Sequence, residues 1–145
     1  MTATPSDPKQ LSWMLDQIKV LRGVTYALVL SSDGFSIARC TELDRDTADV
    51  FAAAAAGYCS IGKAFTQFGV GALNQCMGQY ENGLLLATSV AENSLLAVLC
   101  TCDAEISVVA AAMESMAPNM ADQLGAQART ETSGGALSYG TAGQS

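Results

Sequence analysis

The residue types that most often carry enzyme chemistry are scarce in this chain. The sequence contains no histidine, which excludes Ser-His-Asp and Cys-His catalysis and any imidazole ligand for a metal. Its one cluster of carboxylates, Asp44, Asp46 and Asp49, lacks the alternating spacing and the glycine of a calcium-binding loop. We interpret the cluster as the cap and the early-turn charges of a helix.

Short glycine turns and cysteines are the remaining candidates for a site. Neither Ser31-Ser32-Asp33-Gly34 nor Gly69-Val70-Gly71 has the spacing of a phosphate-binding loop, so we interpret them as a hairpin turn and a helix stop. The cysteines lie within apolar runs and include no Cys-x-x-Cys pair: Cys40, Cys59, Cys76, Cys100 and Cys102. We expect reduced, mostly buried thiols. The sequence therefore predicts no catalytic residue, cofactor or metal, and we do not expect an enzyme.

The composition limits the class of partner. Hydrophobic residues make up 50% of the 145 residues and charged residues 14%, and 14 acidic against 7 basic side chains give a net charge of −7. Such an acidic surface disfavours nucleic acid and anionic membranes. The amino terminus lacks the pattern of a signal peptide, and the longest apolar run, residues 50–57, is far shorter than a membrane span. We expect a cytoplasmic protein without an integral membrane segment, part of whose sparsely charged surface meets another protein.

One domain is expected over residues 8–128, between a flexible start at residues 1–7 and a flexible, glycine- and serine-rich tail at residues 129–145. The domain begins and ends with an amphipathic helix. The first helix has the core stripe Leu11, Met14, Leu15, Ile18 and Leu21. The last helix has the core stripe Ile106, Val109, Ala110, Met113, Met116, Met120 and Leu124. Pro118 predicts a kink or break in this last helix.

Five segments have the pattern of strands. Residues 24–31, 84–90 and 95–102 are apolar at nearly every position, which is typical of central strands covered on both faces. Residues 35–40 and 73–80 are more polar, so we place them at the edges of the sheet. The predicted order of elements is α-β-β-α-β-β-β-α, an α/β (α+β) sandwich with helices on both faces of one sheet.

A long helix from Asp44 to about Gln67 has two different apolar faces. We predict that the bulky face packs in the core: Thr47, Val50, Phe51, Ala54, Tyr58, Ile61, Phe65 and Phe68. The opposite face is small and nearly uncharged, which is unusual for a solvated helix and predicts a packing surface. With the edge strand at residues 73–80, it forms the predicted dimer and partner interface: Ala52, Ala53, Ala56, Cys59, Ser60, Lys63, Gln67, Leu73, Gln75, Met77 and Gln79.

The order of elements and three segments resemble the Roadblock/LC7 family, and within it the bacterial, actinobacterial-type members found beside small Ras-like GTPases. The segments are residues 11–38, with a helix, Gly-Val, an apolar strand and Ser-x-Asp-Gly, then the helix at 44–68, and residues 81–113. The resemblance covers about residues 8–125 and is a pattern of the whole domain. Pro118 departs from that pattern in the last helix.

This resemblance implies a profilin-like fold, with a five-stranded, mostly antiparallel sheet in the strand order 2-1-5-4-3. Members of the family form homodimers by joining the third strand and the second helix of each chain into one continuous sheet, and they act as regulators or scaffolds of small GTPases. The function that the resemblance implies is that of a non-enzymatic, dimeric adaptor of a small Ras-like GTPase in a signalling system. A sensor-kinase-like protein is a further expected partner.

Two other functions stay open. A ligand-binding sensor module of profilin/PAS-like shape needs an internal pocket with convergent polar groups. A GTPase-activating protein needs a cation that reaches the active site of its partner, for which Arg39, Arg45 and Lys63 are the candidates. An internal pocket would distinguish the sensor from the adaptor, and the loss of stimulated hydrolysis in a cation variant would distinguish the activating protein.

Overall fold

The computed structural model describes the backbone of residues 8–144 and the side chains of residues 10–125. Its elements follow in the predicted order. They are α1 (Pro8–Lys19), β1 (Val24–Ser31), β2 (Ser36–Arg39), α2 (Arg45–Lys63), the 3-10 helix η1 (Ala64–Phe68), β3 (Gln75–Tyr80), β4 (Gly83–Ala91), β5 (Ser94–Thr101) and α3 (Ile106–Gln144). No helix among the described residues combines the length and the apolar character that crossing a membrane requires.

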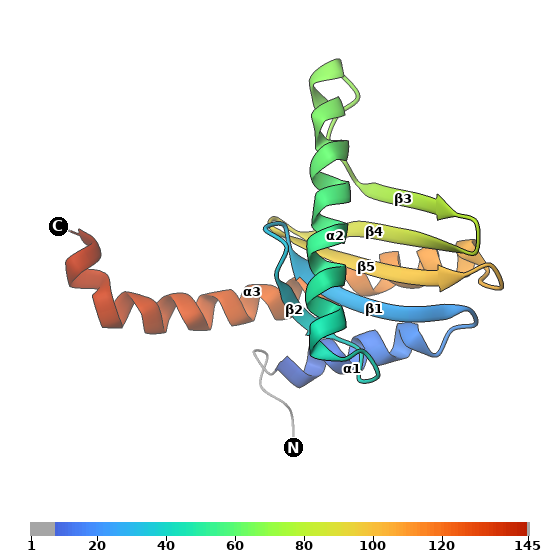
Figure 1. Cartoon of the computed structure of the whole chain (residues 1–145). Coiled ribbons are helices and arrows are strands. Elements are labelled where there is room, and N and C mark those ends of the chain that lie inside the picture. Colours follow the sequence, from blue (N-terminus) through green and yellow to red (C-terminus); the bar gives the residue numbers. More distant parts are fainter. Residues whose placement is uncertain (1–7, 145) are drawn as a thin grey trace.

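The five strands form one antiparallel sheet in the order β2-β1-β5-β4-β3 (Figure 1). The strand order and the edge positions of β2 and β3 are therefore as predicted. The three strands between them are the apolar ones, because their side chains are covered on both faces of the sheet.

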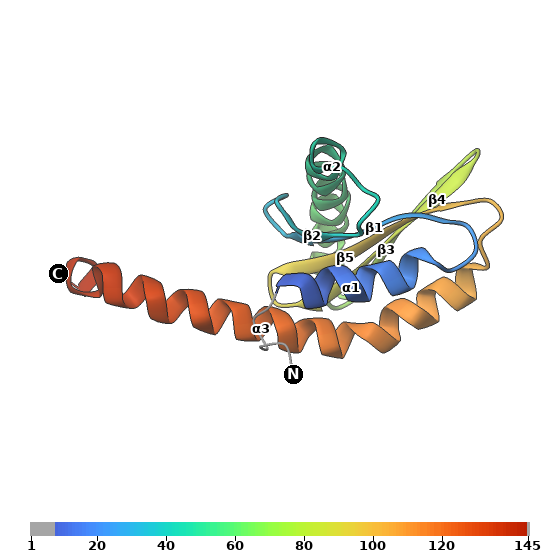
Figure 2. The same ribbon diagram turned by 90° about the horizontal axis from the view of Figure 1, so that it is seen from below.

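Helices cover both faces of this sheet, and this confirms the predicted sandwich. α2 lies on one face, where it contacts β1, β2 and β3. α1 and α3 lie together on the opposite face, against β1 and β4 (Figure 2). The layer beneath them is filled by buried side chains of the two predicted stripes: Leu11, Leu15, Ile18, Val109, Met113 and Met120.

α3 continues through Pro118 without a break, so of the kink or break that the sequence predicts there, the break does not occur. Pro118 and Glu114, whose carbonyl loses its hydrogen bond to the proline, are both exposed, so water can satisfy that carbonyl. The helix runs on to Gln144 and extends beyond the sheet (Figure 2). The flexible tail at residues 129–145 stays a prediction, and residues 1–7 lie outside the described part of the chain.

α2 presents its small face to the sheet, which reverses our prediction. Its buried residues are Ala48, Ala52, Ala55, Ala56 and Cys59. On the bulky face, Val50 is 70% and Phe68 69% exposed, and only Phe51 is half-buried. Small side chains let the helix approach closely, since a Cβ built on Gly34 would lie 3.4 Å from the Ala53 Cα. The predicted bulky core stripe is therefore wrong, because alanines fill this side of the core.

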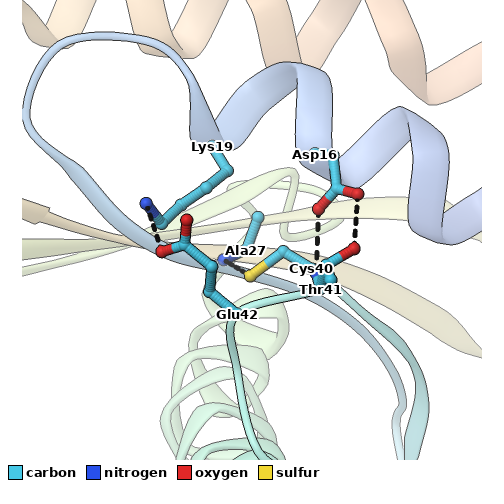
Figure 3. Close-up of polar contacts among 6 residues, drawn as sticks. All are labelled: Asp16, Lys19, Ala27, Cys40, Thr41 and Glu42. Atoms are coloured by element: carbon cyan, nitrogen blue, oxygen red, sulfur yellow. Dashed lines mark hydrogen bonds and ion pairs between the residues drawn. The ribbon is translucent and has the colours of Figure 1, made fainter.

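The segment between β2 and α2 is fixed to α1 by polar contacts (Figure 3). The Asp16 carboxylate accepts hydrogen bonds from the Thr41 amide at 2.8 Å and from the Thr41 hydroxyl at 2.6 Å. One turn later, the Lys19 ammonium lies 3.1 Å from the Glu42 carboxylate. These contacts hold the residues just before α2 against α1.

The start of α2 is capped as predicted. The Asp44 carboxylate accepts hydrogen bonds from the Thr47 amide at 3.1 Å and from the Thr47 hydroxyl at 2.7 Å. The hydrogen bond from the Thr47 hydroxyl is the main reason that the pKa of Asp44 lies below its usual value. The carboxylate cluster that begins the helix thus has a structural role at Asp44.

Candidate protein interaction site

A line of exposed apolar side chains runs along one side of α2 and η1. It consists of Val50, Ala54, Tyr58, Ile61, Phe65 and Phe68, which we call the α2 stripe. The spacing of three or four residues places all of them on one side of the helix. Ile61 is 72% and Phe65 60% exposed. Because a contiguous apolar surface on a single chain marks a site of association, the α2 stripe is the first part of the candidate interface.

The end of this stripe lies past the edge of the sheet. Figure 1 shows the last turn of α2 and η1 projecting beyond β3, the outermost strand on that side. The rings of Phe65 and Phe68 in η1 pack on each other with their centroids 5.9 Å apart. The described sheet offers no strand beneath this aromatic pair, so neither ring is buried.

The two edge strands differ in how open they are to pairing. β2 has four residues, and its register with β1 shifts at Ile37. Short, bulged edges resist the addition of another strand. β3 has six residues in unbroken register with β4, from Gln75 opposite Thr88 to Tyr80 opposite Gly83. The β3 edge is therefore the one that a further strand can extend.

Tyr58 connects the α2 stripe to this edge. Its ring lies across β3 at Gly78, where an added Cβ would be 2.9 Å from the Tyr58 hydroxyl oxygen. The Tyr58 hydroxyl shares a hydrogen bond with that of Tyr80, and this bond raises the pKa of Tyr58. The helix stripe and the strand edge are thus held together as one surface.

The structure divides the predicted interface residues into three groups. Three are buried between α2 and its own sheet, where another chain cannot reach them: Ala52, Ala56 and Cys59. Seven are exposed: Ala53, Ser60, Lys63, Gln67, Gln75, Met77 and Gln79. Leu73 is half-buried against the core. The exposed α2 stripe is a candidate that the sequence analysis places in the core instead, because its helical spacing is typical of a buried face.

The cysteines behave as small apolar residues. All five are free, with Cys40, Cys59 and Cys100 buried. Burial is the main cause that raises the pKa of Cys59 to about 12, and a hydrogen bond with Cys76 adds to it. A protonated thiol is a poor nucleophile and metal ligand. Among the described residues, no cluster of cysteine and carboxylate side chains could hold a metal ion.

A cavity lies between α2, β3 and β4, beside Cys59, Lys63, Asn74 and Cys76. Its volume of about 20 Å³ gives room for about one water molecule. Sites for small organic ligands need at least about 300 Å³. This cavity therefore does not support a ligand-binding sensor.

Comparisons with known proteins identify the family and agree with the fold. The family model described as Roadblock/LC7 domain matches residues 12–100. A solved Roadblock/LC7 domain from Streptomyces avermitilis is similar at 29% identity and a TM-score of 0.67, over 75% of this chain and 96% of that one. The gliding protein MglB from Thermus thermophilus is similar at 19% identity and a TM-score of 0.71, over 85% and 93% of the two chains.

The fold is also similar to that of the profilins, at a lower sequence identity. Acanthamoeba castellanii profilin IA is similar at 14% identity and a TM-score of 0.54, over 77% of this chain and 97% of that one. At this identity the likeness concerns the fold alone, and it confirms the profilin-like architecture. A comparison with curated protein sequences finds no significant match.

Proposed function

Because this chain belongs to the Roadblock/LC7 domain family, we propose that it is a non-enzymatic, dimeric regulator or scaffold of a small Ras-like GTPase. Family membership supplies the expectation of a GTPase, since a fold alone does not determine function. The observation that carries the proposal is the α2 stripe beside the open edge of β3. An exposed apolar line next to an unpaired strand favours association with another chain.

In the proposed dimer, β3 pairs with β3 of a second copy about a two-fold axis. Such an isologous interface uses the same surface of both chains. It extends the five-stranded sheet of each copy into one continuous sheet, and it brings the two α2 helices side by side on one face. Each α2 stripe then covers the other.

The projecting aromatic pair supports this arrangement. Because η1 extends past β3 (Figure 1), pairing at β3 would place Phe65 and Phe68 over the sheet of the second copy. Burying two phenylalanine rings provides a large part of the association energy, at about 1.5–3 kcal/mol for each side chain. Ala53, Ser60, Lys63 and Gln67 are also exposed on α2 and η1, on sides of the helix away from the centre of the α2 stripe, and we assign them to the periphery of the proposed interface.

The dimer is proposed to act on the GTPase by binding one of its nucleotide states. A regulator shifts such an equilibrium only as far as its affinities for the two states differ. The γ-phosphate of GTP orders the switch regions of small GTPases, so we propose a preference for the GTP state. The cytoplasm is the proposed location, where thiols such as the exposed Cys102 stay reduced.

The proposal is tested by pull-down with purified small Ras-like GTPases from the organism that makes this chain, each loaded with GDP or with a non-hydrolysable GTP analogue. The expected result is that the dimer retains more of the GTP-state protein. Equal retention of both states would contradict a state-selective regulator. Failure to retain either state, with the dimer intact, would contradict the GTPase as partner.

Stimulated hydrolysis is measured separately in single-turnover reactions with Arg39→Ala, Arg45→Ala and Lys63→Ala. A scaffold predicts that every variant that still binds the GTPase gives the wild-type rate. An inserted arginine is worth about 10³–10⁵ in rate. A variant that binds normally but loses stimulation of that size would establish a GTPase-activating protein instead.

A further inference from the structure

A groove lies at the end of the sheet opposite to β3, between the edge strand β2 and the first turns of α2. Residues 34–39 form one wall, and Arg45 and Asp49 form the other. Its volume is about 540 Å³. Because β2 and β3 are opposite edges of the sheet, this β2 groove remains free in the dimer proposed above.

The apolar side chains of the β2 groove are exposed, and the backbone of Phe35 is held by hydrogen bonds. Phe35 is 70% and Ile37 37% exposed. The Phe35 amide donates to the Ser31 side-chain oxygen at 3.1 Å, and its carbonyl accepts from the Ser31 amide at 2.8 Å. The irregular register at Ile37 is typical of a bulge that redirects a side chain. The groove thus presents two apolar side chains that the core does not use.

The charged part of the β2 groove is unusual for this protein. Arg39 and Arg45 are two of the chain's 7 basic residues, and both line the groove. Among the described side chains, neither arginine forms an ion pair. Arg45 stands in the first turn of α2, where a cation opposes the helix dipole, so helix stability does not account for it. Asp49 is the one carboxylate in the lining.

We propose that the β2 groove binds an acidic, extended segment of a partner protein. Its apolar side chains would pack on Phe35 and Ile37, and its carboxylates would pair with Arg39 and Arg45. Arginine suits this role because its planar fork of donors matches a carboxylate. The net charge of −7 disfavours polyanions such as nucleic acid. Asp49 in the lining and Asp46 beside Arg45 lower the positive charge of the groove, so recognition depends on direct pairing of single carboxylates with the two arginines.

The proposal is tested by fluorescence anisotropy with two labelled peptides, one of alternating glutamate and valine and one of alternating lysine and valine. Wild-type full-length chain is expected to bind the glutamate peptide and not the lysine peptide. The combined Arg39→Glu and Arg45→Glu substitutions are expected to weaken binding by at least about tenfold, and Phe35→Ser is also expected to weaken it. Arg39→Glu and Arg45→Glu are also measured singly, because Arg22→Glu, at an exposed cation outside the groove, makes the same change of charge as each of them and should leave binding unchanged.

Equal binding of both peptides, or no binding of the glutamate peptide, would overturn the proposal. So would unchanged affinity in the double arginine variant, or an equal loss in Arg22→Glu, which would indicate a general charge effect. Light scattering on the Phe35→Ser variant tests the alternative that a second copy of this chain occupies the β2 groove. A fall in its mass relative to wild type would show that the β2 groove is a self-association surface, and would also overturn the proposal.

Discussion

The ring of Tyr58 on α2 lies directly across Gly78 of β3. A Cβ at Gly78 would meet the Tyr58 hydroxyl oxygen at 2.9 Å and two ring carbons at 3.1 Å. Only a glycine lets the ring lie this close to the strand, and from there its hydroxyl reaches that of Tyr80. This contact couples the helix that carries the apolar stripe to the strand that is open to pairing.

Gly78→Ala is expected to displace the Tyr58 ring and break its hydrogen bond with Tyr80. Because the clash involves the outer end of a side chain, the free energy of unfolding should fall by only about 1–2 kcal/mol. Urea denaturation measures this cost. In a Tyr58→Ala background the same substitution should cost almost nothing, and a full, additive cost there would show that the two residues are not coupled.

Arginine substitutions on the two faces of α2 should affect different properties, folding stability on the small face and association on the exposed stripe. Ala52→Arg places a charge at a residue that is 0% exposed, so we expect a loss of at least about 2–4 kcal/mol in unfolding free energy. Ala54→Arg, on the exposed α2 stripe, should leave the fold intact and weaken association. Circular dichroism through thermal unfolding separates the two. A stable Ala52→Arg variant would contradict the packing of the small face on the sheet.

Asp16→Ala removes both hydrogen bonds to Thr41 and should cost about 1–3 kcal/mol in unfolding free energy. Lys19→Ala removes an ion pair whose Glu42 partner is 72% exposed, and such pairs contribute only about 0–1 kcal/mol. Denaturant titration of both variants checks that Asp16→Ala lowers the free energy of unfolding more than Lys19→Ala does. A larger cost for Lys19→Ala would mean that Asp16 does not fix the segment before α2.

The cysteines should differ in reactivity toward a thiol reagent at neutral pH. Exposed Cys102 should react first, and Cys59, whose pKa is raised from 9.0 to about 12, should react only as the protein opens. The fast phase should disappear in Cys102→Ser, and its persistence would contradict the assignment. Because the raised pKa belongs to the folded state, the stability that Cys59 contributes is fully present below pH 9.0 and is lost as pH rises toward about 12.

The fold was predictable from sequence because the strands differ clearly in polarity. The apolar runs that became β1, β4 and β5 had to be central, which left β2 and β3 at the edges. The faces of α2 were not predictable in the same way. Its spacing shows two faces of different size, but periodicity alone does not say whether the close approach of alanines or the bulk of aromatics meets the sheet.

The candidate sites could not be located from the sequence, because they depend on which residues the fold brings together. Arg39 and Arg45 are separated in sequence by a turn, and only the fold places them along one groove. The projection of Phe65 and Phe68 beyond β3 depends on where α2 crosses the sheet (Figure 1). Hydrophobic side chains on a helix usually indicate a core, so an exposed stripe is recognised only once the core is known.

The central claim is that the α2 stripe and the β3 edge join two copies of this chain, and light scattering on purified protein tests it most directly. The wild-type chain, of 15.0 kDa, should give a mass of about 30 kDa at micromolar concentration. Ile61→Arg, in the middle of the α2 stripe, should give the monomer mass with an unchanged circular dichroism spectrum. A wild-type chain that remains monomeric at high concentration, or an Ile61→Arg variant that remains dimeric, would contradict the account.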